Sequence, residues 1–501
     1  MDDTKLRGSL TIQAFWLLIA KTFAFGFALA LPVLLTRTLS QYEYGLFKQV
    51  FLIITTATAL LPFGFGLSAY YYLPRETDAE RRGQVVFNIL LFNGVIGVVA
   101  CLVFILWPGL IATIFRDPTL PAYSSAIGVV ILLWLFSSFL ETAAVANQEL
   151  RLATIFIVGS QLTRTILLLA AAIVFDSVQA LIYAAVIHGV VQSGILIAYV
   201  SSRFKGFWRA FDWSITCKQV AYALPFGFAG LLYTIQTDLH NYFVSNNFSA
   251  ATFAVYSIGV AQLPLIGIIR DSVSSVILPR INYLQDQGEV REIVVLLVSA
   301  IRKLAVVFLP IYAFLMVTGR EFLIVMFTSA YAESWPSFAM NLTLLPLSLL
   351  EVDALARAYE VHRFFLLKLQ VALTLFMGLA LWPMISHFGL VGAITVVVAI
   401  NFLLRVLLAA KFSSVLELKL RDLVLLKDVG KLILASAIAA FFCVIVRSLV
   451  IGSGAGPLVI FSVCLTAFAA VYVPTMFLFG VPTSDERRKV RRGIERLLQF
   501  A

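Results

Sequence analysis

Long apolar stretches recur along the whole chain and decide what it can fold into. Each is about as long as the 20 or so apolar residues that cross a bilayer as a helix. Hydrophobic residues make up 61% of the 501 positions and charged residues only 13%, about half the charged share of a soluble globular chain. We predict spans at 9–36, 44–73, 84–108, 121–147, 152–175, 178–202, 215–245, 251–279, 292–318, 336–357, 364–386, 389–412, 429–450 and 456–480.

The character of these stretches favours helices over a transmembrane barrel. Barrel strands are short and alternate apolar with polar residues, whereas the runs here are long and continuously apolar. A helix satisfies all of its backbone hydrogen bonds within lipid. We therefore predict an all-α integral membrane protein of about fourteen transmembrane helices, whose first span, 9–36, is too long for a cleaved signal peptide.

Lysine and arginine are distributed very unevenly over the predicted connections. With a cytoplasmic N-terminus, twenty-six of them fall in cytoplasmic connections or the tail, and four in outer connections. That asymmetry is the positive-inside pattern of membrane proteins, and it holds only for an even number of helices. It predicts that both termini are cytoplasmic. It also explains the net charge of +10 by contact with anionic lipid, so no nucleic-acid partner is expected.

A short motif occurs twice, 209 residues apart. Leu39-Ser40 followed by Tyr44-Gly45-Leu46-Phe47 matches Phe248-Ser249 followed by Phe253-Ala254-Val255-Tyr256. Six predicted helices separate the copies, so the two halves insert in the same direction, as in transporters with parallel repeats. The repeat predicts two pseudo-symmetric six-helix lobes, 1–203 and 204–416, followed by two additional helices in 417–482.

The remaining segment, 483–501, is polar and basic. Thr483 and Glu486 have capping-box spacing, and the apolar residues after them share one helical face. Either a basic amphipathic helix on the cytoplasmic leaflet or a solvated basic tail fits this pattern.

Seven basic residues are left inside the predicted spans. A charge at the middle of a membrane helix costs about 2.5–3.5 kcal/mol and normally faces a cavity, a partner or the interface. Cations around one central cavity would attract a phosphate or diphosphate. We take as candidate diphosphate ligands five of the seven, Lys21, Lys48, Arg164, Arg270 and Arg302.

Structural roles compete with that assignment. Lys48, Lys303 and Arg405 could extend to an interface, and Arg270 could pair with Asp238. Because adjacent helical residues diverge by about 100°, we expect no pairing of Arg270 with the neighbouring Asp271.

Carboxylates inside the spans provide a second set of candidates. Asp238 and Glu141 could serve ion coupling, or each could neutralise a nearby cation. The four histidines lack metal-ligand spacing and the four cysteines are scattered, so no metal, disulfide or cofactor is expected. No nucleotide-binding loop, nucleophile elbow or zinc-protease motif occurs, which argues against an enzyme.

Several of these segments resemble a known family. Leu35-Thr36-Arg37-Thr38-Leu39-Ser40 with Tyr44-Gly45-Leu46-Phe47 is similar to the first periplasmic turn of polysaccharide-precursor flippases. Phe63-Gly64-Phe65-Gly66-Leu67-Ser68, followed by Tyr70-Tyr71-Tyr72-Leu73-Pro74, is similar to their second helix, and Asp238 with Phe253-Ala254-Val255-Tyr256 to their seventh-to-eighth helix turn. This family is part of the multidrug/oligosaccharidyl-lipid/polysaccharide (MOP) exporter superfamily.

The resemblance implies alternating access between two lobes in the bacterial inner membrane. It implies translocation of an undecaprenyl-diphosphate-linked oligosaccharide through a central cationic cavity, with a polysaccharide polymerase and export machinery as further partners. In related peptidoglycan-precursor flippases, basic residues of the first, second and eighth helices bind the diphosphate, and Lys21, Lys48 and Arg270 occupy those helices here.

Two other classes of function remain to be weighed. A drug/cation antiporter of the same superfamily would have a cavity rich in carboxylates and aromatic side chains. A membrane glycosyltransferase or polymerase would need a large loop or soluble domain with paired carboxylates, and the predicted connections are too short for either.

Overall fold

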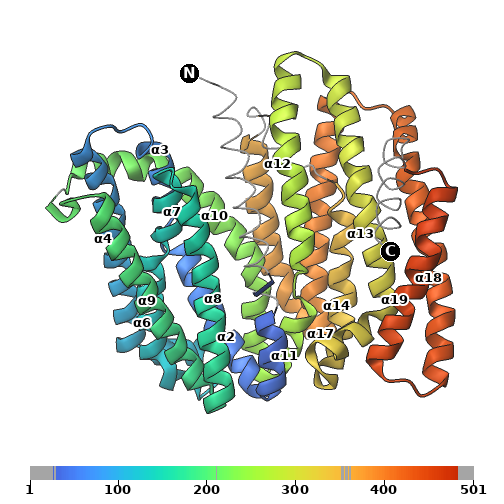
Figure 1. The fold of residues 1–501 in the computed structure, drawn as a ribbon, viewed down its shortest axis with the longest axis horizontal. Helices are drawn as coiled ribbons and strands as arrows, with labels where there is room; N and C mark the ends of the chain where they lie inside the picture. Colours follow the sequence, from blue (N-terminus) through green and yellow to red (C-terminus); the bar gives the residue numbers. More distant parts are fainter. Residues whose placement is uncertain are drawn as a thin grey trace, which may run out of the picture. The chain divides into compact units, whose positions relative to one another are not determined.

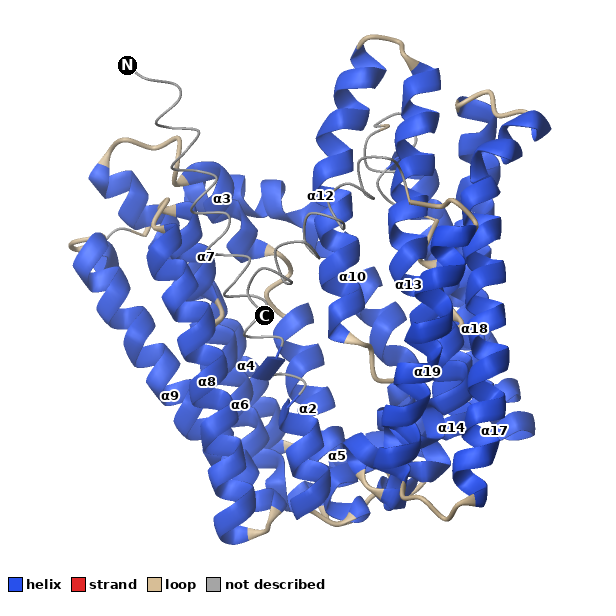
Figure 2. Ribbon diagram, turned by 45° about the vertical axis from the view of Figure 1, so that its right-hand side comes forward, coloured by secondary structure: helices blue, strands red, loops and turns tan. Residues whose placement is uncertain are grey.

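The computed structural model describes residues 26–27, 30–209, 211–350, 355, 359 and 363–482. These residues form helices and connecting loops without any β-strand (Figures 1 and 2). They divide into two compact units, Met1–Ile258 with Thr374–Ala393 (unit 1) and Gly259–Leu373 with Ile394–Ala501 (unit 2). The predicted all-α membrane class is confirmed. Lys21 and the tail 483–501 lie outside the described residues.

Unit 1 is built mainly from the helices of the first half of the chain. In order they are α2 (Gln41–Leu60), η1 (Phe65–Leu67), α3 (Ser68–Tyr72), α4 (Ala79–Leu106), α5 (Gly109–Phe115), η2 (Leu120–Tyr123), α6 (Ser124–Ser137), α7 (Phe139–Ala146), α8 (Leu150–Phe175), α9 (Val178–Arg203), η3 (Phe207–Arg209), α10 (Trp213–Asn247) and α11 (Ala250–Gly259). One core cluster of this unit joins α3, α4, α7, α9 and α10.

Unit 2 holds most of the second half. Its helices are α12 (Pro264–Asp286), α13 (Val290–Phe327), η4 (Ser329–Ser334), α14 (Trp335–Leu342), α15 (Leu344–Leu347), most of α17 (Arg363–Val415), η6 (Leu420–Leu426), α18 (Lys427–Gly452) and α19 (Pro457–Leu478). One core cluster of this unit joins α12, α13 and α17, and α18 and α19 pack on α13.

Every predicted span from the second onward has a helical counterpart. Nine described helices are long and apolar enough to cross a membrane, or ten if the bent pair α2 and η1–α3 is one span. The others are shorter or merged, so the count of fourteen stays a prediction. At Gly389, where we placed a boundary, α17 is interrupted by a left-handed residue with φ of 57°, a conformation that glycine adopts without strain.

The predicted span 251–279 is not one continuous helix. It is divided into α11 and α12, with a break before Pro264 and Leu263 in an extended conformation. Proline has no N–H to donate within a helix, and it disfavours the helical region for the preceding residue. The predicted span 44–73 is bent by 46° next to Pro62, where Phe63 is left-handed with φ of 48°.

The repeated motif has the same local structure in both copies. The hydroxyl of Ser40 accepts a hydrogen bond from the Glu43 N–H (3.2 Å) at the start of α2. The hydroxyl of Ser249 accepts one from the Thr252 N–H (3.2 Å) at the start of α11. Each serine therefore satisfies a backbone donor that the first turn of a helix leaves open.

Gly45 is needed where α2 meets α11. A β-carbon at this position would lie 1.9 Å from the backbone carbonyl oxygen of Ala250. Only glycine allows the two backbones to approach this closely. Further along α2, Gln49 donates to the Ser245 hydroxyl of α10 at 2.8 Å, and both side chains are buried.

Candidate functional site

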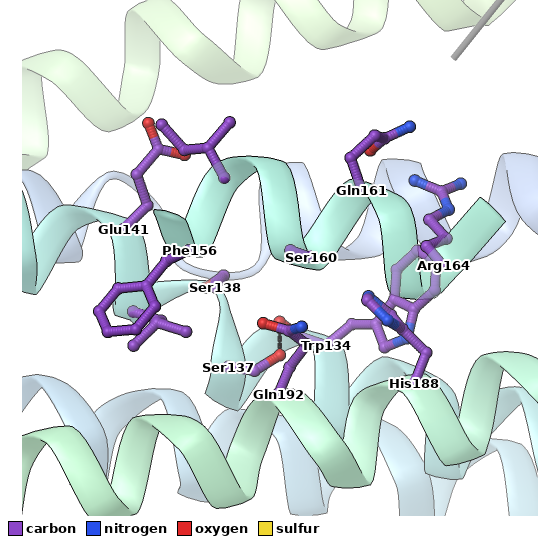
Figure 3. A pocket seen from close by; sticks show the side chains of 12 residues that line it. Trp134, Ser137, Ser138, Glu141, Phe156, Ser160, Gln161, Arg164, His188 and Gln192 are labelled. Atoms are coloured by element: carbon purple, nitrogen blue, oxygen red, sulfur yellow. Dashed lines mark hydrogen bonds between the residues drawn. The ribbon is translucent and has the colours of Figure 1, made fainter. Parts of the chain in front are cut away.

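A polar cavity of about 290 Å³ lies inside unit 1, among α6, α7, α8 and α9 (Figure 3). Most of its lining side chains can form hydrogen bonds, which is unusual for the interior of an apolar helical bundle. They are Ser137, Ser138, Glu141, Ser160, Gln161, Arg164, His188 and Gln192, accompanied by the aromatic residues Trp134 and Phe156.

Helical spacing explains how the polar residues gather. Ser160, Gln161 and Arg164 recur at intervals that place them on one side of α8, and His188 and Gln192 are one turn apart on α9. Figure 3 shows Glu141 at one end of the cavity and Arg164 with His188 at the other. The cavity therefore has a cationic end and an anionic end, connected by neutral hydrogen-bonding groups.

Arg164 is held by aromatic rings. Its guanidinium carbon lies 4.7 Å from the centroid of Trp134 and 5.7 Å from that of Phe51. Each such contact stabilises the cation by about 0.5–2 kcal/mol. The Nε–H of Arg164 has no hydrogen-bond partner among the described residues. That Nε–H is buried, so the rings fix the charge at one end of the cavity that Arg164 lines.

Lys48 is on α2, one turn before Phe51, whose ring contacts the Arg164 guanidinium. Its Nζ is 5.7 Å from the centroid of the Tyr44 ring, one turn earlier on α2. Two like charges in a poorly hydrated region destabilise each other unless an anion joins them. Of the four candidate cations that the structure describes, Lys48 and Arg164 belong to unit 1, and Arg270 and Arg302 to unit 2.

His188 is a member of this group that the sequence did not single out. The imidazole ring of His188 packs edge-on against Trp134, with ring centroids 5.6 Å apart. Its Nδ1 has no partner in the described part of the chain. The one-turn spacing of His188 and Gln192 was the available signal, but it does not reveal which helix they face.

The two candidate carboxylates are in different surroundings. Asp238 on α10 accepts a hydrogen bond of 2.6 Å from the Thr56 hydroxyl on α2, so it links these helices. Glu141 lines the cavity and is exposed at its edge. In the described residues, no three His, Cys, Asp or Glu side chains form a group that could hold a metal ion.

The other two described candidates belong to unit 2. Our expectation that Arg270 and Asp271 do not pair is wrong, because Nε and Oδ1 are 3.7 Å apart. The long arginine side chain can fold back across the angle between adjacent residues. Since the two side chains are 40% and 77% exposed, this pair contributes little stability.

Arg302 and Arg405 both bind backbone carbonyls at the ends of helical segments. Arg302 donates to the carbonyl of Val481 just beyond α19, and Arg405 to that of Leu347 at the end of α15, each at 3.0 Å. Cations are favourable at helix C-termini, where carbonyls lack partners. Arg405 is buried, so it packs inside unit 2 and does not extend to an interface.

The family model described as "Polysaccharide biosynthesis protein" matches residues 34–336. A search of curated protein sequences gave no match. Among solved structures, the chain is similar to the lipid II flippase MurJ in an inward closed conformation. The TM-score is 0.71 and the identity 14%, over 92% of this chain and 98% of that one.

Multidrug transporters have a related fold. An inward-facing MATE-family transporter of the MOP superfamily matches with TM-score 0.57 and 15% identity, over 78% of this chain and 94% of that one. A MOP superfamily transporter from Pyrococcus furiosus matches with TM-score 0.53 and 15% identity, over 81% and 95%. The family match and these folds confirm the resemblance drawn from the sequence motifs. The chain belongs to the polysaccharide biosynthesis protein family and is a multi-pass membrane protein with the fold of MOP-superfamily flippases and transporters.

Proposed function

We propose that this protein is a flippase for an undecaprenyl-diphosphate-linked oligosaccharide in the bacterial inner membrane. The observation that carries the proposal is the cationic end of the unit 1 cavity. There Arg164 lines the cavity, contacts two aromatic rings and meets α2 at Phe51, one turn from Lys48. A diphosphate supplies the negative charge that these two cations lack.

The rest of the cavity suits a sugar. Hydroxyl and amide groups of Ser160, Gln161 and Gln192 can donate to and accept from sugar hydroxyls. The ring of Trp134 offers an apolar face beside them. A polyprenyl tail can stay in lipid while its polar head group is held by the protein, so the apolar anchor never has to enter water.

The wider mechanism follows from the sequence repeat and the charge distribution. We propose alternating access by two lobes, 1–203 and 204–416, with 417–482 as an addition and 483–501 as a basic cytoplasmic tail. The excess of basic residues in alternate connections supports cytoplasmic termini. A polysaccharide polymerase and export machinery would receive the translocated product.

The remaining candidate ligands, Lys21, Arg270 and Arg302, are each supported by a different observation. We propose Lys21 as a diphosphate ligand because of its position in the predicted first span. Arg270 is partly exposed and only weakly paired, so it can still meet a phosphate. The contact of Arg302 with the Val481 carbonyl supports a structural role beside the proposed ligand role.

The decisive experiment compares Arg164→Ala, Arg164→Lys and Lys48→Ala in a strain that lacks the flippase. We expect Arg164→Ala and Lys48→Ala to lower precursor export at least ten-fold, since one charge-assisted contact contributes about 1.5–3 kcal/mol. Arg164→Lys keeps the charge but loses the planar fork, and should give an intermediate result. The control is Lys303→Ala, which removes an exposed cation of α13. Full export by both alanine variants would refute the proposal.

A drug/cation antiporter is the second candidate, and Glu141 is the observation that favours it. Its carboxylate lines the same cavity as the aromatic residues Trp134 and Phe156, a combination that suits an organic cation. Glu141→Gln separates the two functions. It should abolish cation efflux if the protein is an antiporter, and should leave precursor export more active than Arg164→Ala does if it is a flippase.

A further inference from the structure

A second hollow in unit 1 differs from the polar cavity in its chemistry. It is a groove of about 580 Å³ along α4, closed by side chains of α6, α9 and η3. All of its lining residues are apolar, among them Phe87, Leu91, Val95, Val99, Ile197 and Phe207. We call it the α4 groove. Its volume is typical of a small-molecule site.

The α4 groove has the length of one leaflet. From Phe87 to Val99 it follows α4 for twelve residues, about 18 Å at 1.5 Å per residue. Half of the hydrocarbon core of a bilayer is about 15 Å thick. The groove can therefore hold one extended acyl chain that runs from the membrane surface to the middle of the bilayer.

Gly94 gives the groove its depth. A β-carbon at Gly94 would meet only the ring edge of Phe136, at 3.9 Å, so no packing contact requires a glycine here. Several neighbours on α4 remain open, since Val95 and Val99 are 53% and 55% exposed. A side chain in place of Gly94 would occupy space that is now available to a ligand.

The mouth of the groove is basic and aromatic. Phe207 begins η3 in the connection from α9 to α10, where Lys205 and Trp208 are exposed. Two acidic residues lie nearby. Glu149 pairs with Arg203 at 2.8 Å, and Asp212 accepts from the first turn of α10. Exposed tryptophan beside lysine is typical of the lipid head-group region, and the lysine leaves a positive charge for an anion.

The substrate's own tail does not fit this place. Helix α6 separates the two hollows, because Phe136 lines the α4 groove whereas Trp134 and Ser137 line the polar cavity. A chain attached to a head group in that cavity would have to pass through α6 to reach the groove.

We propose that the α4 groove binds an anionic phospholipid of the cytoplasmic leaflet, with one acyl chain in the groove and the phosphate near Lys205. The apolar lining selects the chain, and the basic mouth selects the head group. A bound lipid covers apolar surface of α4 and joins it to η3. This site is independent of the substrate proposal, and its leaflet follows from the cytoplasmic orientation proposed above.

The test is native mass spectrometry of the full-length protein titrated with dioleoyl phosphatidylglycerol or dioleoyl phosphatidylcholine. We expect phosphatidylglycerol to bind more tightly. Val95→Trp fills the groove and should lower the binding of both lipids. Lys205→Glu should lower phosphatidylglycerol binding alone by at least five-fold, since one basic residue near an anionic membrane surface is worth about 1 kcal/mol.

Two matched controls use residues outside the groove. Ile173→Trp changes an exposed apolar residue of α8, and Lys411→Glu an exposed lysine of α17. Both should bind phosphatidylglycerol like the wild type. Unchanged phosphatidylcholine binding by Lys205→Glu shows that this variant is folded. Equal binding of both lipids by the wild type would overturn the proposal. So would unchanged binding by Val95→Trp, or an isoprenoid carrier retained in place of phospholipid.

Discussion

The ion pair between Glu321 on α13 and Arg447 on α18 provides a quantitative test of how the additional helices are attached. Nε and one terminal nitrogen of Arg447 both donate to Oε1 of Glu321, at 3.2 and 2.7 Å. The two side chains are unequally covered, since that of Glu321 is 8% exposed and that of Arg447 is 30% exposed. The second carboxylate oxygen of Glu321 has no partner among the described residues.

This asymmetry predicts unequal costs for the two single substitutions. Arg447→Leu leaves a buried carboxylate without its counter-charge, which costs about 3–5 kcal/mol. Glu321→Leu leaves an arginine that can extend to water, so the loss should be about 1 kcal/mol. The double variant replaces the pair by apolar side chains and should be close to the wild type, which corresponds to a coupling of about 4–6 kcal/mol.

The measurement is equilibrium unfolding of the purified protein in mixed micelles with increasing denaturing detergent, for the wild type and all three variants. Equal losses in the two single variants would contradict the argument from burial. A double variant that loses the sum of the single effects would show that the two side chains do not stabilise each other.

Three further predictions concern local packing and pH. Gly45→Ala should destabilise the protein by about 3 kcal/mol, seen as a lower thermal midpoint, because the new methyl group meets a backbone carbonyl of α11. Ser40→Ala should cost about 1 kcal/mol in the same assay through loss of the α2 cap. The Lys419 backbone N–H and the Arg291 side chain lower the pKa of Asp422 from its usual 3.8, so its stabilisation of η6 is present at neutral pH and is lost as the pH falls below about 4. Asp422→Asn should remove that part of the pH dependence in melting curves recorded between pH 7 and 3.

Much of the helix pattern could be predicted from the sequence because a chain that crosses lipid must satisfy its backbone hydrogen bonds internally, and a helix does so. Apolar length predicted where helices run, and the predicted boundary between 386 and 389 coincides with the break at Gly389. The duplicated motif predicted equivalent positions, and Ser40 and Ser249 cap their helices in the same way. The break before Pro264 was missed because hydropathy does not distinguish a straight helix from two apolar segments joined at an angle.

The candidate site was less accessible. Lys48 and Arg164 were chosen from the sequence because a charge within a membrane span is unfavourable and therefore needs a role. The sequence did not indicate that α2 and α8 pack near each other. It gave no reason to choose His188 or Gln192, since a polar residue in a membrane helix can face a cavity, a neighbour or an interface.

The sequence by itself determined the membrane class and the repeat, and its basic residues predict the direction of insertion. Each depends on free energies that are local to a segment: transfer into lipid, charge near the bilayer surface and helix capping. Only the tertiary structure decided which polar side chains share a cavity, which cations bind backbone carbonyls and where α4 is left hollow. Those outcomes depend on which helix faces pack together. Helix packing brings together residues that are far apart in the chain, and their positions in the sequence do not indicate that they are in contact.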